Sequence, residues 1–196
     1  MAVSAGAPSR EPVIPSACGR WALVTGASAG IGEAFARALA AEGAHVILVA
    51  RRLQSLRRIA RELEDAHGVS TLAIAADLAA PGVAERLAAE AMERAPPIDI
   101  LVSNAGRRDP GRFEERGFEE HRAFLRLAIE AGATLTRMLL PGMQARAYGR
   151  IVHVASLAAL LPGSAERTLY AASKAFLVSF SQSLAAENRG RGVHVC

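Results

Sequence analysis

Three polar side chains in the last quarter of the sequence have types and spacing suited to proton chemistry. Tyr170 and Lys174 lie four residues apart in a segment with helical periodicity, so they share one helix face. Ser156 follows an apolar run. A tyrosine hydroxyl can donate a proton to a carbonyl oxygen while hydride arrives at the carbon, and a nearby ammonium lowers the tyrosine pKa from about 10. We therefore predict that these three residues are catalytic, with Ser156 holding the carbonyl oxygen.

The composition supports this interpretation of Lys174. It is the only lysine among 23 basic residues, and an ammonium and a guanidinium are not interchangeable beside a phenol or a ribose. Tyr170 is one of two tyrosines. The plainer alternative is an ordinary helix with a buried tyrosine and a surface lysine, and the scarcity of both residue types favours the catalytic role.

A glycine-rich segment connects the first predicted strand to the first predicted helix. Gly26 permits a tight turn, Gly30 lets the backbone approach a phosphate, and Gly32 lets the helix pack closely on a sheet. The unpaired N–H groups and the dipole at a helix N-terminus favour an anion. We predict that these glycines, together with Ser28 and Ile31, bind a dinucleotide cofactor.

Two arginines follow the second predicted strand, where a domain that binds NAD usually carries an acidic residue. Here Ala50 is followed by Arg51 and Arg52, and guanidinium groups can bind a 2′-phosphate through several donors. NADP is therefore favoured over NAD. The alternative is that both arginines begin the solvated face of the next helix.

Two further segments follow predicted strands. Asp77-Leu78 offers a carboxylate that could accept a hydrogen bond from an adenine amino group or cap the next helix. Asn104-Ala105-Gly106 offers an amide that can bond to neighbouring backbone, and a glycine that leaves room for the cofactor. We predict that both segments, with Tyr170 and Lys174, contribute to cofactor binding.

Apolar runs and helical patterns alternate along the chain, which predicts the elements that position these residues. Strands are expected at 21–25, 45–49, 70–75, 98–102, 151–155 and 192–196, and helices at 31–42, 53–67, 81–94, 118–144 and 168–188. Continuously apolar strands alternating with helices predict an α/β fold with a doubly wound parallel sheet and helices on both faces, which is a Rossmann domain. We expect one domain over 19–196 and a disordered leader over 1–18.

Composition narrows the class of protein. Hydrophobic residues make up 51% of the chain and aromatic residues 5%, and the net charge is +4 without a basic stripe. We therefore expect no nucleic-acid binding. No stretch approaches the roughly 18 apolar residues of a membrane span, so we expect no such span either. Cys18 and Cys196 form no disulfide framework or metal-ligand spacing, so we expect no metal and a reducing, cytoplasmic location.

With these motifs in hand, residues 20–196 resemble the short-chain dehydrogenase/reductase family. The glycine turn resembles its TGxxxGxG motif, residues 104–106 its NAG motif, and Ser156 with Tyr170 and Lys174 its Ser and YxxxK motifs. The resemblance implies a Rossmann fold, NADP or NAD, and a small-molecule alcohol or carbonyl substrate. It also implies that Lys174 binds the nicotinamide ribose, and that the helices at 118–144 and 168–189 form a homo-oligomer interface.

The chain differs from the family pattern in two places. Ala128 occupies the position at which the family usually has a catalytic asparagine, which helps to hold a water linking the lysine to solvent. Family members also continue past the sixth strand with a substrate-covering segment, so we expect a C-terminally short domain. The alternative hypotheses are a catalytically impaired relative that binds cofactor or a partner, and a subunit completed by a partner chain.

Overall fold

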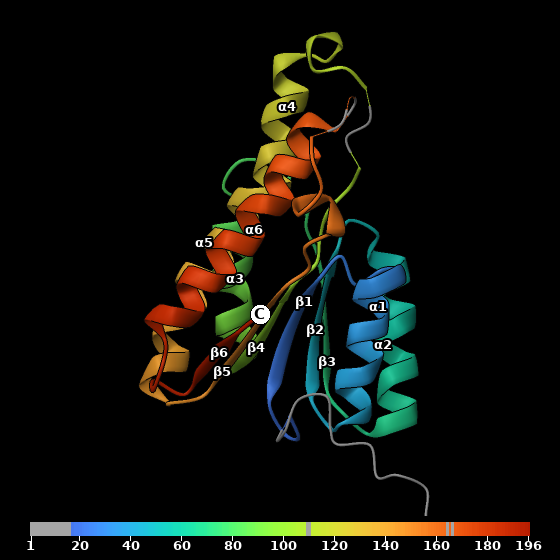
Figure 1. The fold of residues 1–196 in the computed structure, drawn as a ribbon. Coiled ribbons are helices and arrows are strands. Elements are labelled where there is room, and N and C mark those ends of the chain that lie inside the picture. Colours follow the sequence, from blue (N-terminus) through green and yellow to red (C-terminus); the bar gives the residue numbers. More distant parts are fainter. Residues whose placement is uncertain (1–16, 109–110, 164, 166) are drawn as a thin grey trace, which may run out of the picture.

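One parallel sheet organises the molecule. The computed structural model describes residues 17–108, 111–163, 165 and 167–196. Its six strands are ordered β3-β2-β1-β4-β5-β6 (Figure 1), which is an order typical of the predicted doubly wound sheet. The strands are β1 Trp21–Thr25, β2 His45–Ala50, β3 Thr71–Ala75, β4 Ile98–Ser103, β5 Gly149–His153 and β6 Val193–Val195.

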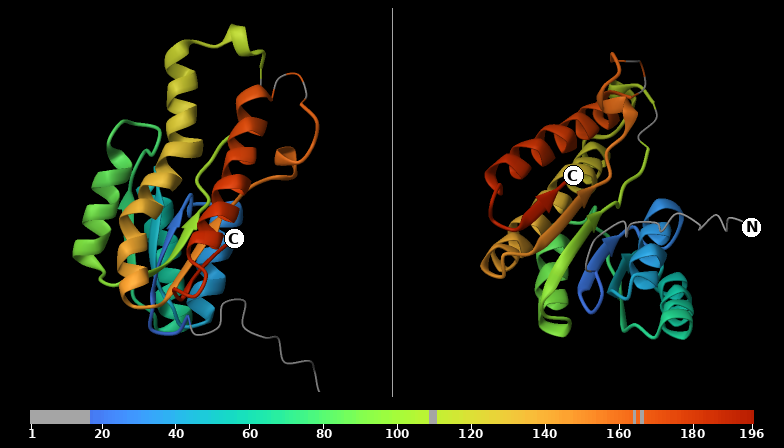
Figure 2. Two further views of the ribbon diagram at one scale, coloured as in Figure 1. Left: turned by 60° about the vertical axis from the view of Figure 1, so that its left-hand side comes forward. Right: turned by 60° about the horizontal axis from the view of Figure 1, so that its bottom comes forward.

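Helices cover both faces of the sheet, as Figures 1 and 2 show. One face carries α1 Gly30–Ala41 and α2 Leu53–His67, and the other carries α3 Val83–Arg94, α5 Ala131–Ala145 and α6 Thr168–Glu187. The helix α4 Phe118–Leu125 extends beyond the carboxyl ends of the strands (Figure 1). Short helical turns lie at η1 Phe113–Glu115, η2 Arg126–Glu130 and η3 Leu157–Ala159. No described helix is long and apolar enough to cross a membrane.

The central strands are apolar on both sides because both sides are covered. Leu23 of β1 packs with α3 and α5, whereas its neighbour Val24 packs with α1 and α2. Successive strand residues point to opposite faces, so the uninterrupted apolar runs in the sequence divide between two core clusters. Both Leu23 and Val24 are fully buried.

The chain that precedes β1 is described from residue 17 onward. Residues 1–16 of the expected leader lie outside the described residues. Ala17 packs in the core cluster on the side of α1 and α2, and the Gly19 N–H donates to the Gly43 carbonyl at 2.9 Å. The last two residues of the expected leader therefore belong to the folded body.

The helical region expected at 118–144 is interrupted. Between α4 and α5, η2 forms a π-helical turn in which the Ala131 N–H donates to the Arg126 carbonyl. A π turn adds one residue to the helix and alters the hydrophobic pattern too little to be predicted from the sequence. Such turns are frequent at functional sites. Ala128 lies inside this turn.

Two predicted boundaries shift by two residues. The helix expected from residue 81 begins at Val83, because Gly82 adopts a left-handed conformation with φ +69°. The fifth strand, expected at 151–155, spans Gly149–His153. In both cases the apolar pattern located the element, and local backbone geometry set its ends.

Candidate active site

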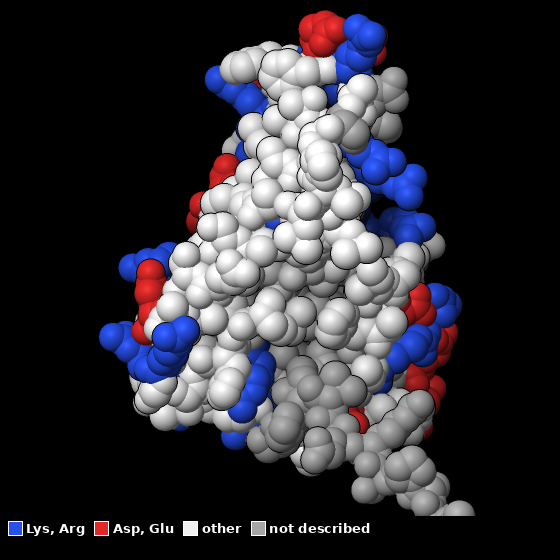
Figure 3. Space-filling view, viewed as in Figure 1, with Lys and Arg blue, Asp and Glu red and all other residues white. Residues whose placement is uncertain are grey.

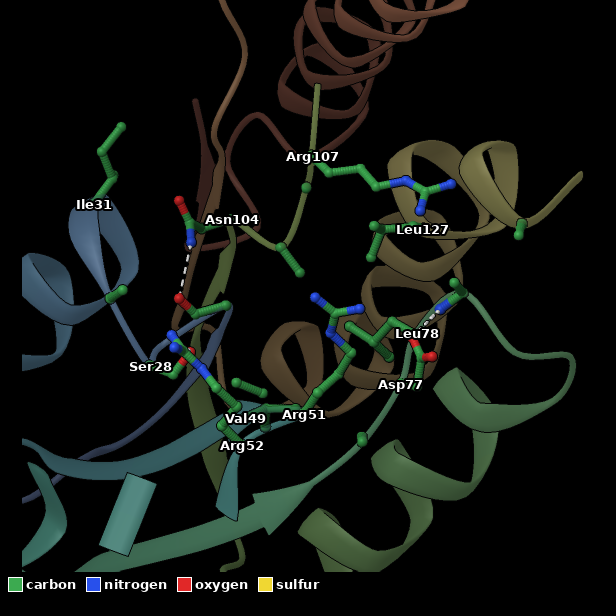
Figure 4. A pocket seen from close by; sticks show the side chains of 18 residues that line it. Ser28, Ile31, Val49, Arg51, Arg52, Asp77, Leu78, Asn104, Arg107 and Leu127 are labelled. Atoms are coloured by element: carbon green, nitrogen blue, oxygen red, sulfur yellow. Dashed lines mark hydrogen bonds between the residues drawn. The ribbon is translucent and has the colours of Figure 1, made fainter. Parts of the chain in front are cut away.

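A cavity of about 580 Å³ lies at the carboxyl ends of the strands, where the strand order reverses (Figure 4). This is where ligands bind in open α/β sheets. Segments that follow β1, β2, β3 and β4 meet there with α4 and η2. The lining residues are Gly26, Ser28, Ala29, Ile31, Val49, Ala50, Arg51, Arg52, Ala76, Asp77, Leu78, Ala79, Asn104, Ala105, Gly106, Arg107, Ala123 and Leu127.

At two of its glycines, Gly26 and Gly32, the glycine turn leaves no room for a side chain. A Cβ placed on Gly26 would lie 2.7 Å from Asn104 Nδ2, and Gly26 has φ +68°. A Cβ on Gly32 would meet the Gly26 carbonyl and, at 2.5 Å, Asn104 Nδ2. Gly32 therefore does not line the cavity; it allows α1 to approach the sheet. Gly30 also lies off the cavity wall, with φ +60°.

The start of α1 has no side-chain cap. Its N-cap residue, Ala29, has no side-chain oxygen to bond the first N–H groups, although Glu33 supplies an acidic residue in the first turn. Both Ala29 and Ile31 line the cavity. The N–H groups of this first turn are thus left for a bound anion.

A hydrogen-bond network holds Asn104 against the glycine turn. Thr25 Oγ1 donates to the Val102 carbonyl at 3.3 Å and accepts from the N–H groups of Asn104 and Ala105, both at 3.0 Å. Asn104 Nδ2 donates to the Thr25 carbonyl at 3.0 Å. The side chain of Asn104 therefore locks β1 to β4. Thr25 was not predicted as a site residue, although its place before the first glycine was a usable signal.

The two arginines after β2 take different positions. Arg52 donates from Nη2 to Ser28 Oγ at 3.3 Å, which links β2 to the glycine turn. Arg51 directs its guanidinium group into the cavity (Figure 4). Both side chains are exposed. Together with Arg107 they outnumber Asp77, the one carboxylate among the described lining residues, so this cavity is electropositive.

The segment after β3 forms a tight turn along one wall. Asp77 Oδ1 accepts from the Ala79 N–H at 3.1 Å, and the Ala80 N–H donates to the Asp77 carbonyl at 3.0 Å. The Ala76 N–H donates to the Ala50 carbonyl at 3.1 Å. Leu78 is buried at 6% exposure, so the turn has an apolar base and a carboxylate at the cavity.

Lys174 lies beside the cavity on α6. Its Nζ donates to the Val154 carbonyl at 2.6 Å and lies 5.9 Å from the centre of the Tyr170 ring. The same Nζ lies 4.0 Å from a Cβ placed on Gly106, a lining residue. Burial lowers the pKa of Lys174 below its usual value. The ammonium therefore lies between the tyrosine and the wall formed by residues 104–106.

Ser156 precedes η3, which packs against α6. Its Oγ accepts from the Ala158 N–H at 3.2 Å and caps this short turn. Ser156 and Tyr170 are both half-buried. Ser156 thus follows β5, whereas Tyr170 and Lys174 lie on α6. All three lie outside the residues that line the described cavity, whereas ten of the predicted cofactor residues line it.

Several lining residues were not among the predicted cofactor-binding residues. Arg107, Ala123 and Leu127 line the cavity, and Ala123 and Leu127 form the wall that α4 and η2 contribute. Arg107 directly follows the 104–106 motif, so its proximity could have been inferred. Ala123 and Leu127 come from a helix whose position over the cavity depends on its packing, and no local sequence signal marks them.

Comparison with known proteins gives one family. The family model described as short chain dehydrogenase matches residues 20–196. Ketoacyl reductase HetN of a Nostoc species is 37% identical over 177 residues, which are 90% of this chain and 61% of that protein. A very-long-chain 3-oxoacyl-CoA reductase of Anas platyrhynchos is 36% identical, over 90% of this chain and 57% of its own length. The chain thus spans about three fifths of these relatives.

Solved structures share the fold. A short-chain dehydrogenase from Sphingobium yanoikuyae, in complex with NADPH, superposes with a TM-score of 0.84 at 31% identity, covering 90% of this chain and 68% of that one. L-Sorbose reductase from Gluconobacter frateurii, complexed with NADPH and L-sorbose, gives a TM-score of 0.83 at 38% identity, covering 91% and 67%. These likenesses confirm the predicted Rossmann architecture.

Proposed function

Because the chain belongs to the short-chain dehydrogenase family, we propose that it binds NADP(H) and transfers hydride between this cofactor and an alcohol or carbonyl compound. The observation that carries the proposal is the cavity itself. The cavity is lined both by the first turn of α1, which has no side-chain cap, and by Arg51, which follows β2. Bound NADPH would supply the hydride. The protein's own residues would bind the cofactor, orient the substrate and protonate its carbonyl oxygen.

The residues present fit such a cofactor. A volume of about 580 Å³ lies within the range of small-molecule sites, and side chains at Gly26 or Gly32 would collide with Asn104. Ala29 and Ile31 show that the start of α1 lines the cavity, and a helix N-terminus is suited to bind a diphosphate. The excess of guanidinium groups matches an anionic ligand that carries a 2′-phosphate. Both relatives of known structure described above are NADPH complexes.

We propose that Ser156, Tyr170 and Lys174 carry out the proton transfer. Tyr170 donates its hydroxyl proton to the substrate oxygen, and Ser156 donates a hydrogen bond to the same oxygen. Lys174, held by the Val154 carbonyl and next to Gly106, supplies the positive charge that favours the phenolate after transfer. We also propose that Lys174 binds the nicotinamide ribose.

The surface next to Ser156 supports an apolar carbonyl substrate. Leu157, Leu160 and Leu161 are exposed by 77%, 73% and 62%, respectively. Three leucines that face solvent beside the proposed reaction centre are suited to contact an apolar substrate. Two relatives are named for ketoacyl and 3-oxoacyl-CoA reduction, which is consistent with a carbonyl attached to an apolar chain.

Titration with NADPH and with NADH, followed by nucleotide fluorescence, tests the proposal. We expect saturable NADPH binding and weaker NADH binding. Equal binding of both would remove the NADP preference and leave the fold assignment intact. Binding of neither would contradict the proposed function of this chain.

A second candidate function is cofactor binding without efficient turnover, and Ala128 is the observation that favours it. The resemblance to the family implies an asparagine here that holds a water near the lysine, and Ala128 has no side-chain polar group. Ala128→Asn, compared with Ala128→Ser, tests this. A large rise in the rate of NADPH oxidation in A128N with unchanged NADPH affinity would support the impaired relative.

We also propose that the long helices mediate self-association. The helix α6 exposes Phe176 by 37%, and this ring stacks on Phe180 at 5.5 Å. Apolar exposed helix faces are typical of homo-oligomer contacts. Light scattering after size exclusion, with Phe176→Gln as the variant, distinguishes an oligomer that dissociates on substitution from a monomer.

A further inference from the structure

One hydrogen bond connects the Asp77 turn, which forms one wall of the cavity, to η2, which contributes to the neighbouring wall. Arg126 Nε donates to the Ala79 carbonyl at 2.7 Å, across 47 positions of sequence. Arg126 is the first residue of η2 and is half-buried. Ala79 belongs to the turn after β3, and both Ala79 and Asp77 line the cavity.

The position of Arg126 connects it to the neighbouring wall. Its neighbour Leu127 and the residue one turn earlier, Ala123, both line the cavity. Arg126 itself does not line it; its carbonyl accepts the π-type hydrogen bond from Ala131. A movement of the Asp77 turn relative to α4 and η2 would therefore have to break the bond between Arg126 and Ala79.

Leu78 anchors the turn in the core cluster against which Leu127 also packs, but the described hydrogen bonds of the turn include no other one to η2. The turn's remaining described bonds are internal, from the Ala79 N–H to Asp77 Oδ1 and from the Ala80 N–H to the Asp77 carbonyl, or run back to β2 through Ala76. Internal bonds preserve the shape of the turn and do not set its distance from η2.

We propose that Arg126 is a positioning residue that sets the spacing between the Asp77 turn and the wall formed by Ala123 and Leu127, and thereby the affinity for the adenosine half of the cofactor. The inference rests on the proposed function, because it assigns this part of the cavity to adenosine. Arg126 acts through Ala79 and does not contact the ligand.

The test compares three variants by calorimetric titration with 2′,5′-ADP, which contains the adenosine half alone, and with NADPH. Arg126→Ala is expected to weaken binding of both about five- to tenfold, the equivalent of one lost hydrogen bond. Arg126→Lys keeps one donor and is expected to lie between wild type and R126A. Arg122→Ala is the matched control, because Arg122 lies one turn earlier in α4, bonds to Glu119 at 3.2 Å and is exposed.

Hydrogen exchange of the unliganded protein supplies a second readout that does not depend on the ligand. We expect faster exchange over residues 76–80 in R126A, and wild-type exchange there in R122A. Unchanged exchange, or faster exchange with unchanged 2′,5′-ADP affinity, would overturn the inference. Wild-type protein that binds neither 2′,5′-ADP nor NADPH would instead overturn the proposed function, and the role of Arg126 in cofactor binding with it.

Discussion

At the scale of single residues, adjacent arginines have separate roles because successive side chains leave the end of a strand in different directions. Arg52 turns toward Ser28 and connects two backbone segments. Arg51 turns into the cavity. The sequence pair alone predicts a phosphate-binding charge. Both arginines line the cavity, and only the structure shows that Arg52 is bonded to Ser28.

Arg51→Ala is expected to weaken NADPH binding about tenfold and to change NADH binding less than twofold, because only NADPH carries the 2′-phosphate. Fluorescence titration of both nucleotides measures this. Arg57→Ala is the control, since Arg57 is an exposed arginine of α2 outside the cavity. An equal loss of both affinities in R51A would assign the guanidinium to a group that the two cofactors share.

At the scale of elements, a buried histidine joins β5 to α5 and to α6, the helix that carries Tyr170 and Lys174. His153 of β5 lies with Nε2 3.1 Å from Thr136 Oγ1 on α5 and Nδ1 2.9 Å from Ser181 Oγ on α6. Phe180 of α6 packs against the imidazole ring at 5.3 Å. Burial lowers the pKa of His153 to about 4, so the neutral ring is the form that fits this junction.

The lowered pKa predicts a loss of stability in acid. The unfolded chain binds a proton at His153 below its usual pKa of 6.5, whereas the native protein binds it only near pH 4. The free energy of unfolding should therefore fall as the pH drops from about 6.5 to 4, by about 3 kcal/mol from this residue. Above that window its contribution is constant.

Urea unfolding at pH 7.5, 5.5 and 4.5 checks the prediction. His153→Gln keeps a donor and an acceptor but does not titrate, so the difference in pH dependence between wild type and H153Q isolates the histidine from the carboxylates. Parallel curves for the two proteins would show that His153 is protonated equally in the folded and unfolded states.

At the scale of the whole molecule, the two ends of the sheet have separate tasks. The carboxyl ends of the strands surround the cavity, and the amino end of β4 carries Asp99, which is 2% exposed. Asp99 accepts from Arg20 Nη1 and Arg146 Nε, both at 2.9 Å. The pairs tie the chain before β1 and the residue that follows α5 to the start of β4. In the view of Figure 3, charged side chains lie mainly around the edge of a large surface without Lys, Arg, Asp or Glu.

Asp99→Asn is expected to lower the free energy of unfolding by about 3 kcal/mol, because it leaves two guanidinium groups without their buried carboxylate. Its NADPH affinity should match that of wild type, since Asp99 lies at the opposite end of the sheet. Urea unfolding and fluorescence titration measure the two quantities. Glu90→Gln, which removes a surface pair with Arg94, should change stability by less than about 1 kcal/mol. A loss of affinity in D99N would mean that the two ends are coupled.

The sequence by itself determined the class of fold, the order of the elements and most residues of the cavity. Apolar runs that alternate with helical patterns specify buried parallel strands, and such strands end at one edge of a sheet. Motifs directly after strands 1 to 4 must therefore meet, which is why Gly26, Arg51, Asp77 and Asn104 were found together. These inferences need only local pattern and the geometry of parallel strands.

The tertiary structure decided what depends on packing between distant elements. It brought Ala123 and Leu127 over the cavity, paired Arg126 with Ala79, and enclosed His153 between two helices. It also placed a π turn in the helix where Ala128 lies. None of these follows from local sequence, because each is set by the angle and distance at which helices pack on the sheet. Arg126 and Ala79 are 47 positions apart, and a contact over that separation leaves no periodic pattern in the sequence.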